Sequence, residues 1–322
     1  MTSSWPPRLF VLAAGLGRRL RPLTCVRAKP AVPVAGLPLI VRILARVQSQ
    51  GIREVVINLH HRPDTIAALV GDGVDLGLAV RYSWEQPVLG SAGGPRRALA
   101  LLESDPYLMV NGDTLSDVSL RELWEHHLVS NALVTMAVIP NPAPDRYGGV
   151  LVDDDGWVTG FSRRGDPRPS FHFIGAQVVA QQVFLPLPDG QPDESVLRVY
   201  PHLMQARPRS VKAFITTASF LDIGTVRDYV DTWQAVAAAE AADPWAPGRR
   251  LLLHPSTTLT RCLIWNDVTI GAGSTLEDTI LTDGVTIPPG SQYARCAIVR
   301  ADGCRPEPGE RVDGDLLIAP FV

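Results

Sequence analysis

The sequence predicts an α/β protein with a doubly wound, mostly parallel, Rossmann-like sheet, followed by a short left-handed β-helix domain. Two observations support this prediction. Short β-branched runs alternate with longer amphipathic segments over the first two thirds of the chain, which is typical of parallel strands covered by crossover helices. Beyond residue 250 the sequence repeats itself at a constant offset of 17 residues, which is typical of stacked β coils.

The first region contains four clear strand patterns and four clear helix patterns. The expected strands are 8–15, 53–60, 107–113 and 132–140, and the expected helices are 39–51, 95–104, 120–130 and 226–242. Ligands of such sheets bind beyond the carboxyl ends of the strands. The loops after "FVLAAG" and "YLMVNGD", which are rich in glycine and charge, should therefore line one crevice.

The segment "DPWAPGRR", residues 243–250, contains two prolines and a glycine and is the expected linker between domains 1–243 and 250–322. In the second domain the repeat aligns two apolar columns, which are Leu259/Leu276/Tyr293 and Ile264/Leu281/Ile298. A weaker fourth copy is expected at 308–318. The offset is about one residue shorter than a regular hexapeptide coil, and a β-sandwich with regular turns stays an alternative.

Composition limits the class of partner. The 322 residues hold 30 Lys+Arg and 33 Asp+Glu, a net charge of −3, which predicts neither a nucleic-acid nor a membrane partner. The N-terminus has no secretory pattern, so a cytoplasmic, soluble protein is expected. The cysteines form no CxxC pair and are expected to be reduced structural thiols; they are Cys25, Cys262, Cys296 and Cys304. The adjacent histidine pairs 60–61 and 126–127 do not predict a metal site, because chain neighbours point apart.

The turn after the first strand, "GLGRRLRPLT", combines flexible backbone with a positive cluster. Gly15 and Gly17 allow a ligand to approach the backbone, and the arginines at 18, 19 and 21 have the fork geometry that suits phosphate oxygens. Lys29 follows, and Pro30 favours an extended conformation for it. The turn therefore predicts a phosphate site, although solvated arginines on an ordinary turn would look similar.

Two well-known phosphate loops do not fit this turn. The dinucleotide fingerprint needs a third glycine where Leu20 stands, and a P-loop needs Gly-Lys-Ser/Thr. The longer context resembles the sugar-phosphate nucleotidyltransferases, or nucleotide-sugar pyrophosphorylases, whose signature runs Gly-x-Gly-Thr-Arg-Leu-x-Pro-Leu-Thr and then Lys-Pro. The match extends from Gly15 to Thr24 and to Lys29-Pro30. It continues through most of the first 235 residues, and a catalytic domain followed by a β-helix is a known layout of that family.

The resemblance implies a site, residue by residue. Arg19 and Lys29 are the expected catalytic cations, and "VNGD" and "FLDIGT" make Asp113 and Asp222 the expected Mg²⁺ ligands. The implied nucleotide-binding residues are Ala13, Ala14, Gly15, Gly17, Arg18, Gly90, Ser91, Ala92 and Gly93. The implied residues for the sugar phosphate are Gly149, Arg163, Arg164 and Gly175.

This sequence also departs from the family pattern. Arg18 replaces the small threonine of the loop, Ser162-Arg163-Arg164 replaces the usual Glu-Lys-Pro, and only Gly175 remains of Asn-x-Gly. The sugar contacts are therefore the least determined, and an ordinary turn could explain the glycines at 148 and 149. The name of the family implies transfer of a nucleoside monophosphate from a nucleoside triphosphate to a sugar 1-phosphate, with release of pyrophosphate.

The sequence favours a guanylyltransferase for mannose 1-phosphate or a related hexose 1-phosphate, because the appended β-helix resembles mannose-1-phosphate guanylyltransferases. A uridylyl- or thymidylyltransferase is the alternative, since "AGGPRRALALL" resembles N-acetylmuramate 1-phosphate uridylyltransferases. A non-catalytic regulatory paralogue should have lost Arg19, Lys29, Asp113 or Asp222, which are all present. An acyltransferase is disfavoured because the coils contain a single histidine, His254. The coils are expected to serve packing and homo-oligomerisation.

Overall fold

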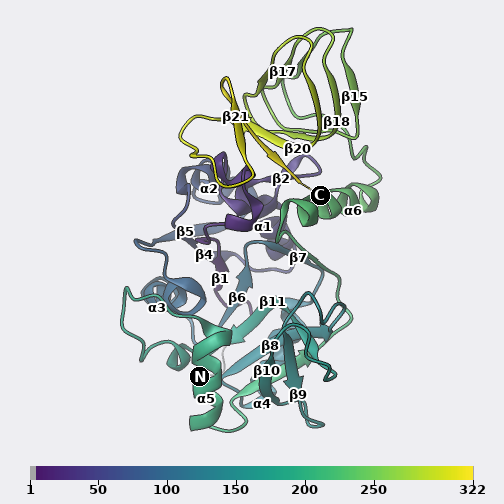
Figure 1. Ribbon diagram of the computed structural model, residues 1–322. Coiled ribbons are helices and arrows are strands. Elements are labelled where there is room, and N and C mark those ends of the chain that lie inside the picture. The colour runs from purple at the N-terminus through teal and green to yellow at the C-terminus, as the bar shows by residue number, and fades with distance from the viewer. Residues whose placement is uncertain (1–4, 322) are drawn as a thin grey trace. The chain divides into compact units, whose positions relative to one another are not determined.

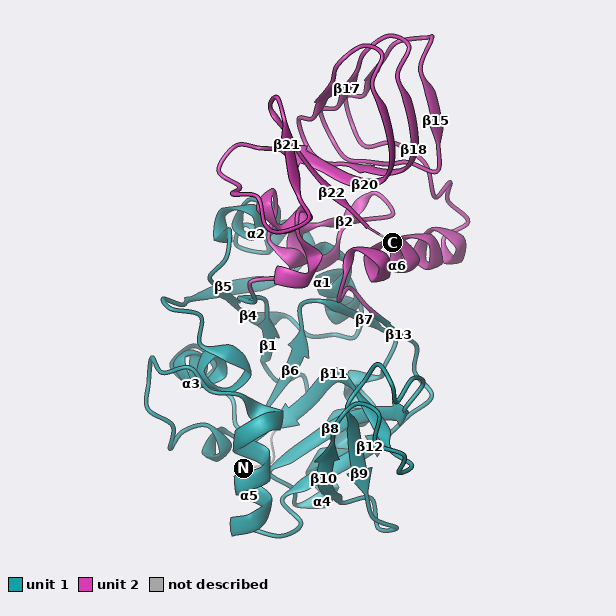
Figure 2. Cartoon of the chain, in the orientation of Figure 1, with its two compact units in different colours: residues 1–15, 41–221 teal, residues 16–40, 222–322 magenta. Residues whose placement is uncertain are grey.

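The computed structural model describes residues 5–321, so residues 1–4 and 322 of the two expected domains lie outside the described residues. Its contacts divide the chain into two compact units (Figure 2). Unit 1 comprises residues 1–15 and 41–221, and unit 2 comprises residues 16–40 and 222–322. The segment 243–250, expected to link two domains, is mostly irregular and lies inside unit 2, so its function as a linker stays a prediction. The first 40 residues are thus shared between the two units.

Unit 1 is built on one mixed sheet of nine strands (Figure 1). Along the sheet the order is β10-β9-β11-β6-β1-β4-β5, and β8 pairs with β11 and β12. The strands are β1 (Leu9–Leu12), β4 (Glu54–Leu59), β5 (Ala79–Trp84), β6 (Tyr107–Asn111), β8 (Val134–Pro140), β9 (Gly149–Val152), β10 (Val158–Ser162), β11 (Phe171–Val179) and β12 (Val211–Ile215). The four neighbours from β6 to β5 are parallel, as expected, whereas β11 runs antiparallel and makes the sheet mixed.

Helices cover this sheet because each presents an apolar side to it. The helices of unit 1 are α2 (Pro63–Val70), α3 (Gly90–Leu102), α4 (Leu120–Ser130) and α5 (Tyr200–Ala206), and α1 (Leu39–Ser49) begins at the boundary with unit 2. Helix α3 packs on β1, β4 and β5, and α4 packs on β8, β11 and β12. The hydrophobic core of unit 1 contains large side chains that are fully buried, among them Phe10, Tyr107 and Tyr200. Off the main sheet lies the short strand β7 (Thr114–Ser116).

Unit 2 contains the stacked coils that the repeat predicts. The strands are β14 (Leu252–Leu253), β15 (Thr258–Thr260), β16 (Leu263–Ile264), β17 (Thr269–Ile270), β18 (Thr275–Leu281), β19 (Thr286–Ile287) and β20 (Gln292–Arg300). They pair in parallel and in the register of the repeat, so that Leu259 lies beside Leu276 and Leu276 beside Tyr293. The aligned apolar residues form one core, which excludes the β-sandwich alternative.

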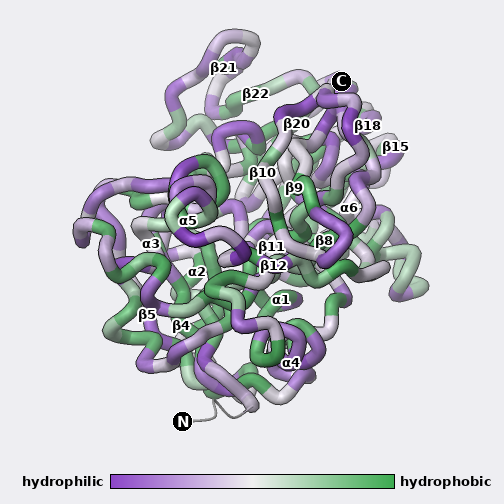
Figure 3. The backbone as a smooth tube through the Cα atoms, turned by 90° about the horizontal axis from the view of Figure 1, so that it is seen from below, coloured by the Kyte–Doolittle hydropathy of each residue, from purple (hydrophilic) through white to green (hydrophobic). Residues whose placement is uncertain are grey.

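The expected fourth coil at 308–318 is wrong. Strand β21 (Arg311–Asp313) and strand β22 (Leu316–Pro320) form a hairpin, and β22 pairs antiparallel with β20. Gly314, at a φ of +58°, makes the turn, and the insertion 301–310 lets the chain reverse. In Figure 3, β22 is mainly green, or hydrophobic, and β21 mainly purple. The hairpin thus covers the last coil with a buried strand and ends the stack with an exposed one.

Unit 2 also contains the long helix α6 (Val226–Ala239), which follows β13 (Phe220–Asp222) at the unit boundary. Segment 16–40 contributes three short 3-10 helices, Arg18–Leu20, Leu23–Cys25 and Lys29–Ala31, and the small hairpin of β2 (Pro33–Val34) and β3 (Leu37–Pro38). Helix α6 packs against β2. Across residues 5–321, none of the helices combines the length and the apolar character needed to cross a bilayer.

The prediction that all four cysteines are reduced is wrong for two of them. Cys25 and Cys304 form a disulfide within unit 2, with their Cα atoms 5.7 Å apart and a sequence separation of 279. Spacing patterns reveal pairs that are close in the chain, so a pair made by folding the coils onto segment 16–40 leaves no such signal. Cys262 and Cys296 are free and buried, as expected.

Candidate functional site

The first part of the predicted site is the carboxyl edge of the parallel strands in unit 1. Strands β1 and β6 are parallel neighbours with Leu12 beside Asn111. The two loops that follow them therefore leave the sheet at the same edge, as the sequence predicts. Asp113, at the end of "VNGD", is half-buried and accepts a hydrogen bond from the Thr114 hydroxyl at 3.2 Å.

Gly112 is required at this edge by the close approach of β1. Its amide donates to the Leu12 carbonyl oxygen at 2.8 Å, and a Cβ on residue 112 would lie 2.7 Å from that oxygen. Beside it, Gly175 has a φ of +80° at an irregularity in the pairing of β11, where a Cβ would lie 2.9 Å from the Asn111 amide nitrogen. Gly175 thus lies next to the loop of Asp113 within unit 1, although no sugar contact follows from that position alone.

The backbone after β1 is fixed by a buried asparagine that sequence reasoning missed. The Oδ1 atom of Asn58 accepts the amides of Ala13 at 2.6 Å and Ala14 at 3.2 Å, and both alanines are buried. Gly15 is exposed, with open space where a Cβ would point. The chain is therefore held firmly up to Ala14 and becomes accessible at Gly15.

Asn58 is in turn bonded to a buried carboxylate, Glu85. Asn58 Nδ2 donates to Glu85 Oε1 at 2.6 Å, and Glu85 Oε2 accepts the Leu89 amide at 2.8 Å, immediately before α3. Burial raises the pKa of Glu85, and these hydrogen bonds act in the opposite direction. The available signal was a lone asparagine in the apolar run "VVINL" and a glutamate before "QPVLG". This Asn58–Glu85 network ties the loop after β1 to the start of α3.

Residues 90–93, the predicted base and ribose segment, form the first turn of α3, so the helix begins at Gly90 rather than at Pro95. A Cβ on Gly90 would lie 2.6 Å from the Asp193 carbonyl oxygen. A Cβ on Gly93 would collide with the Gln191 carbonyl oxygen. The Ala92 amide donates to Asp193 at 2.9 Å, and Ala92 and Gly93 are buried. Within this segment, Gly90 and Ser91 are the partly exposed positions.

The predicted sugar-phosphate residues of β9 and β10 lie at a crowded strand end. A Cβ on Gly149 would collide with the Ser170 side chain and lie 2.5 Å from the Ser162 hydroxyl, so the glycine has a packing reason. Arg163 and Arg164 follow β10 and are exposed, and neither guanidinium is in an ion pair with a described residue of the chain. They are accessible cations, and their function stays a prediction.

The second part of the predicted site lies in unit 2, on the glycine and arginine loop. Gly17 has a φ of +60°, and a Cβ there would lie 2.7 Å from Thr24 Cγ2 and 3.2 Å from Lys29 Cβ. The Thr24 hydroxyl donates to the Gly17 carbonyl oxygen at 3.2 Å. The chain thus folds back so that Lys29 lies beside the loop. The extended conformation expected for Lys29 is wrong: it opens a 3-10 helix, whose first turn tolerates Pro30 because no donor is needed there.

Arg19 and Asp222, far apart in sequence, approach the same point. A Cβ on Gly224 would lie 3.2 Å from Asp222 Oδ2 and 3.6 Å from Arg19 Nη1. The position of Asp222 is fixed from both sides: its carbonyl accepts the Thr232 hydroxyl at 3.2 Å, and Thr225 with Asp228 forms a capping box at the start of α6. Within unit 2, one predicted catalytic cation and one predicted metal ligand therefore come together.

Arg18 and Arg19 are exposed, as phosphate-binding arginines should be, but Arg21 is not part of that group. Its guanidinium lies 3.0 Å from Glu310 and 3.1 Å from Glu307, and it donates to the Arg305 carbonyl oxygen at 2.8 Å. The expectation that Arg21 serves phosphate is corrected, because the insertion 301–310 supplies carboxylates that neutralise it.

Carboxylate oxygens are suitable ligands for a hard divalent ion. Among residues 5–321 no group of three or more His, Cys, Asp or Glu side chains is arranged to hold a metal. Asp113 and Asp222 supply two carboxylates in separate units, and both take part in interactions within the protein. Two carboxylates with the remaining ligands from phosphate and water would suit Mg²⁺, which binds substrate phosphates in that way. The chemistry of the donors fits, and the shared ligation stays a prediction.

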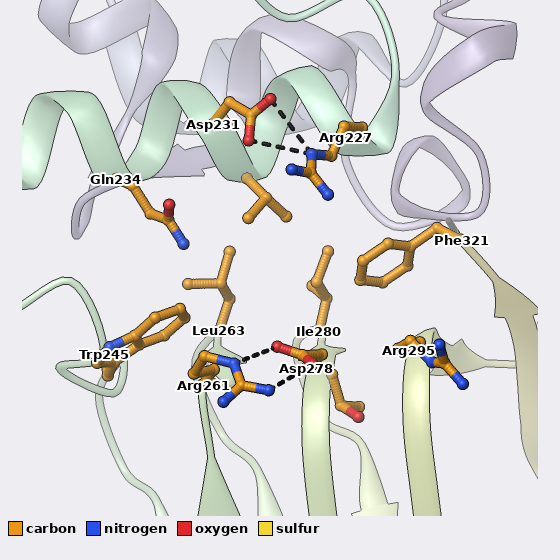
Figure 4. Close-up of a pocket in the computed structure, with 12 residues that line it drawn as sticks. Arg227, Asp231, Gln234, Trp245, Arg261, Leu263, Asp278, Ile280, Arg295 and Phe321 are labelled. Atoms are coloured by element: carbon orange, nitrogen blue, oxygen red, sulfur yellow. Dashed lines mark hydrogen bonds and ion pairs between the residues drawn. The ribbon is translucent and has the colours of Figure 1, made fainter.

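A separate cavity of about 260 Å³ lies in unit 2 between α6 and the coils (Figure 4). Its polar side chains are largely paired with one another: Arg261 binds Asp278 through two bonds of 2.6 and 2.7 Å, and Arg227 lies 3.2 Å from Asp231. Trp245, Leu263 and Phe321 supply apolar walls. None of the predicted catalytic, nucleotide, sugar or metal residues lines this cavity, so it is not the site predicted from the sequence.

Comparison with known proteins gives a consistent result. A family model described as nucleotidyl transferase matches residues 9–239. A mannose-1-phosphate guanylyltransferase of Mycobacterium tuberculosis is 28% identical over 295 residues, covering 88% of this chain and 82% of that protein. An N-acetylmuramate alpha-1-phosphate uridylyltransferase of Neisseria meningitidis is 33% identical over 223 residues, covering 68% of this chain and 94% of that protein.

A solved structure gives the same fold. The crystal structure of HddC from Yersinia pseudotuberculosis matches with a TM-score of 0.63 at 23% identity. The match covers 71% of this chain and 99% of that chain. At this identity the likeness supports the architecture of the matched part and leaves the choice of substrate open.

Proposed function

The chain belongs to the nucleotidyl transferase family and is a sugar-1-phosphate nucleotidyltransferase; we propose that it transfers GMP from GTP to mannose 1-phosphate or a related hexose 1-phosphate. The observation that supports this choice is the identity of the relatives that align over most of the chain. The guanylyltransferase of M. tuberculosis is 28% identical over 88% of the chain, whereas a UTP–glucose-1-phosphate uridylyltransferase of Synechocystis that aligns over 91% is 24% identical.

In the proposed reaction an oxygen of the sugar 1-phosphate attacks the α-phosphorus of GTP. The new P–O bond gives the GDP-sugar, and the bond to the β-phosphate oxygen breaks and releases pyrophosphate. Because two anions must meet and the leaving group gains charge, catalysis depends on positioning and charge neutralisation. We assign the leaving pyrophosphate to Arg19, and the α-phosphate or the sugar phosphate to Lys29.

The remaining assignments concern the triphosphate, the base with its ribose, and the sugar phosphate. Ala13, Ala14, Gly15, Gly17 and Arg18 would surround the triphosphate, and their support is the accessible backbone at Gly15 and the exposed Arg18. We assign base and ribose to residues 90–93, of which Gly90 and Ser91 have partly exposed surfaces. We assign the sugar phosphate to Gly149, Gly175 and the exposed Arg163 and Arg164.

We further propose Mg²⁺ as the metal, with Asp113 and Asp222 as its protein ligands. When bound, the ion supplies positive charge that offsets the repulsion between the phosphates. Asp222 supports this assignment through its place beside Arg19, since a metal ligand and a phosphate-binding cation should serve the same triphosphate. Substitution of each aspartate by asparagine should lower activity and raise the Mg²⁺ concentration needed for half-maximal rate.

The experiment that tests the substrates is a panel assay of pyrophosphate release. GTP, UTP, dTTP, ATP and CTP are each offered with mannose 1-phosphate, glucose 1-phosphate and N-acetylmuramate 1-phosphate in the presence of Mg²⁺. We expect GTP with mannose 1-phosphate, or with another hexose 1-phosphate, to give the highest kcat/KM. A higher value with UTP would replace the proposal by the uridylyltransferase alternative, which the 33% identity to the N. meningitidis protein favours.

The same assay decides whether the chain is a non-catalytic regulatory paralogue, because release of pyrophosphate with any pair excludes that alternative. The cytoplasmic location and the homo-oligomeric state expected from the sequence remain proposals. Disulfides are rare in cytosolic proteins of mesophiles, so the Cys25–Cys304 bond weighs against that location.

A further inference from the structure

The loop that contains Arg19 and Lys29 belongs to the unit of the C-terminal coils. Residues 16–40 group with residues 222–322 (Figure 2), and the 3-10 helix Leu23–Cys25 packs on β20. The loop from residue 16 to residue 32 has no regular structure except three 3-10 turns. Such a segment has few bonds of its own to fix it, so its conformation depends on what it contacts.

The first contact is covalent. The Cys25–Cys304 disulfide joins the loop to the segment that follows β20. Around it, Cys25 and Val26 pack against a small buried cluster of Val299, Cys304 and Leu317. Arg19 lies six positions before Cys25 in the sequence, so the disulfide limits how far that arginine can move.

The second contact is a two-bond ion pair. Arg27 Nε donates to Asp283 Oδ2 at 2.6 Å, and Nη2 donates to Oδ1 at 2.8 Å. The Arg27 guanidinium lies 5.4 Å from the ring centre of Trp265, a buried residue whose Nε1 donates to the Tyr229 hydroxyl at 2.9 Å. The side chains of Arg27 and Asp283 are only 16% and 25% exposed. A fork-shaped pair that is largely removed from water and stacked on a fixed ring sets both position and orientation.

The third contact is made by Arg21, whose charge is neutralised by Glu307 and Glu310 of the insertion 301–310 that follows the coils. Its partner Glu310 is 8% exposed. Arg21 and Cys25 flank the part of the loop just after Arg19, and Arg27 comes two residues before Lys29. The residues that contact the coils therefore lie between the two predicted catalytic cations.

We propose that the coils position the phosphate-binding loop. Arg27, Asp283 and the cysteines of the Cys25–Cys304 disulfide are positioning residues that hold Arg19 and Lys29 where they can bind the triphosphate. The inference rests on the proposed nucleotidyl transfer. A loop that is ordered before binding loses less conformational entropy when it closes on a ligand. Release of these contacts should therefore weaken triphosphate binding even while the fold persists.

The test compares Arg27→Gln with a matched control, Arg261→Gln. Both changes remove an arginine that forms two hydrogen bonds to one aspartate of the coils. Arg27 lies on the loop of residues 16–32, whereas Arg261 lies in the coils, as do its partners Glu277 and Asp278 on β18. Kinetics are measured at a temperature where both variants are folded by circular dichroism. We expect KM for the nucleotide to rise about tenfold in Arg27→Gln and to change less than about twofold in the control. The KM of Arg27→Lys should lie between those of the native protein and Arg27→Gln, because lysine keeps the positive charge and lacks the fork of the guanidinium.

A double-mutant cycle assigns the effect to the pair. Asp283→Asn should raise KM to a similar degree, and Arg27→Gln with Asp283→Asn should be no worse than Arg27→Gln alone. Equal kinetic constants for Arg27→Gln and Arg261→Gln would overturn the proposal, since the coils would then serve stability alone.

A second measurement needs no substrate. Hydrogen exchange of the amides in residues 16–32 should be faster in Arg27→Gln than in Arg261→Gln, and unchanged exchange would also overturn the proposal. If the native protein releases pyrophosphate with none of the offered pairs, the proposed function fails, while the exchange data still decide whether these contacts order the loop.

A separate experiment tests the disulfide. Dithiothreitol gives two electrons and two protons to the Cys25–Cys304 bond, which becomes two thiols while the dithiol closes to a cyclic disulfide. We expect the reductant to raise KM for the nucleotide several-fold in the native protein and to leave a Cys25→Ser/Cys304→Ser variant, already at the higher KM, unchanged. An unchanged KM in the reduced native protein would overturn the positioning function of the disulfide.

Discussion

The two loops assigned to the nucleotide are fixed by different physical means. In unit 1 the backbone after β1 and the start of α3 are joined by the buried Asn58–Glu85 network. In unit 2 the loop of Arg19 is held by a disulfide and by ion pairs that keep some exposure to water. Buried hydrogen bonds are costly to break because their partners cannot turn to solvent. The first loop is therefore part of the core, whereas the second can be loosened without unfolding.

The largest effect should come from the chemistry that the second loop performs. Arg19→Ala should lower kcat by at least about two orders of magnitude, because a catalytic arginine in phosphoryl transfer contributes roughly 10³ to 10⁵ in rate. The exposed Arg19 side chain can be removed without opening the core, so circular dichroism and the melting temperature should be unchanged. The assay is pyrophosphorolysis of the GDP-sugar, and near-normal turnover would refute the assignment of Arg19.

The second-largest effect is expected when the network that holds the loop after β1 is removed. Asn58→Ala should lower the free energy of unfolding by about 3 to 4 kcal/mol, since it leaves the Ala13 amide and a Glu85 oxygen buried without a partner. Urea denaturation measures the change. The control is Asn141→Ala, which removes a half-buried asparagine on a loop of the same unit. A loss no greater than that of the control would show that the Asn58–Glu85 network does not stabilise the unit.

Acid should act on unit 1 through a buried histidine. His127 is 5% exposed, its Nδ1 is bonded to the Thr135 hydroxyl at 2.8 Å, and burial lowers its pKa to about 4. The unfolded chain takes up this proton near pH 6.5 and the folded chain only near pH 4, so stability falls as the pH drops between those values, by up to about 3 kcal/mol. Denaturation at several pH values measures the slope, which should be shallower in His127→Gln; equal slopes would contradict this account.

The smallest effect is expected for an ion pair on the coils. Arg261→Gln should lower the free energy of unfolding only slightly, because the Arg261 and Asp278 side chains are 48% and 34% exposed and water screens their attraction. Thermal denaturation measures it. A loss as large as that of Asn58→Ala would remove the distinction between buried hydrogen bonds and exposed pairs on which the comparison depends.

The elements that could be predicted from the sequence are those whose signal is local or periodic. Helix 120–130 is observed with the same bounds, and the 17-residue offset became the register of the coils because stacked coils place equivalent residues side by side. Gly17 could be expected to be special, and the structure shows why, since a side chain there would meet Thr24. The family could be predicted too, because the residues of its signature lie within one short stretch of the chain, from Gly15 to Pro30.

What could not be predicted depends on contacts between distant segments. Asn58 looks like a single polar residue in a strand, and its partners at 13 and 85 belong to other elements. Gly90 begins a helix because residues 191–194 pack on that turn, which a run of glycine and alanine does not indicate. The Cys25–Cys304 bond and the Arg21 ion pairs exist only after the coils meet the loop.

The central claim is that Arg19 and Lys29 hold the phosphates of a nucleotide whose metal is bound by Asp113 and Asp222. A crystal structure of the protein with Mg²⁺ and a non-hydrolysable GTP analogue tests it most directly. The claim predicts the Arg19 guanidinium and the Lys29 ammonium within hydrogen-bond distance of phosphate oxygens, and both carboxylates on one metal ion. A nucleotide bound elsewhere on the protein, in contact with none of these four side chains, would contradict it.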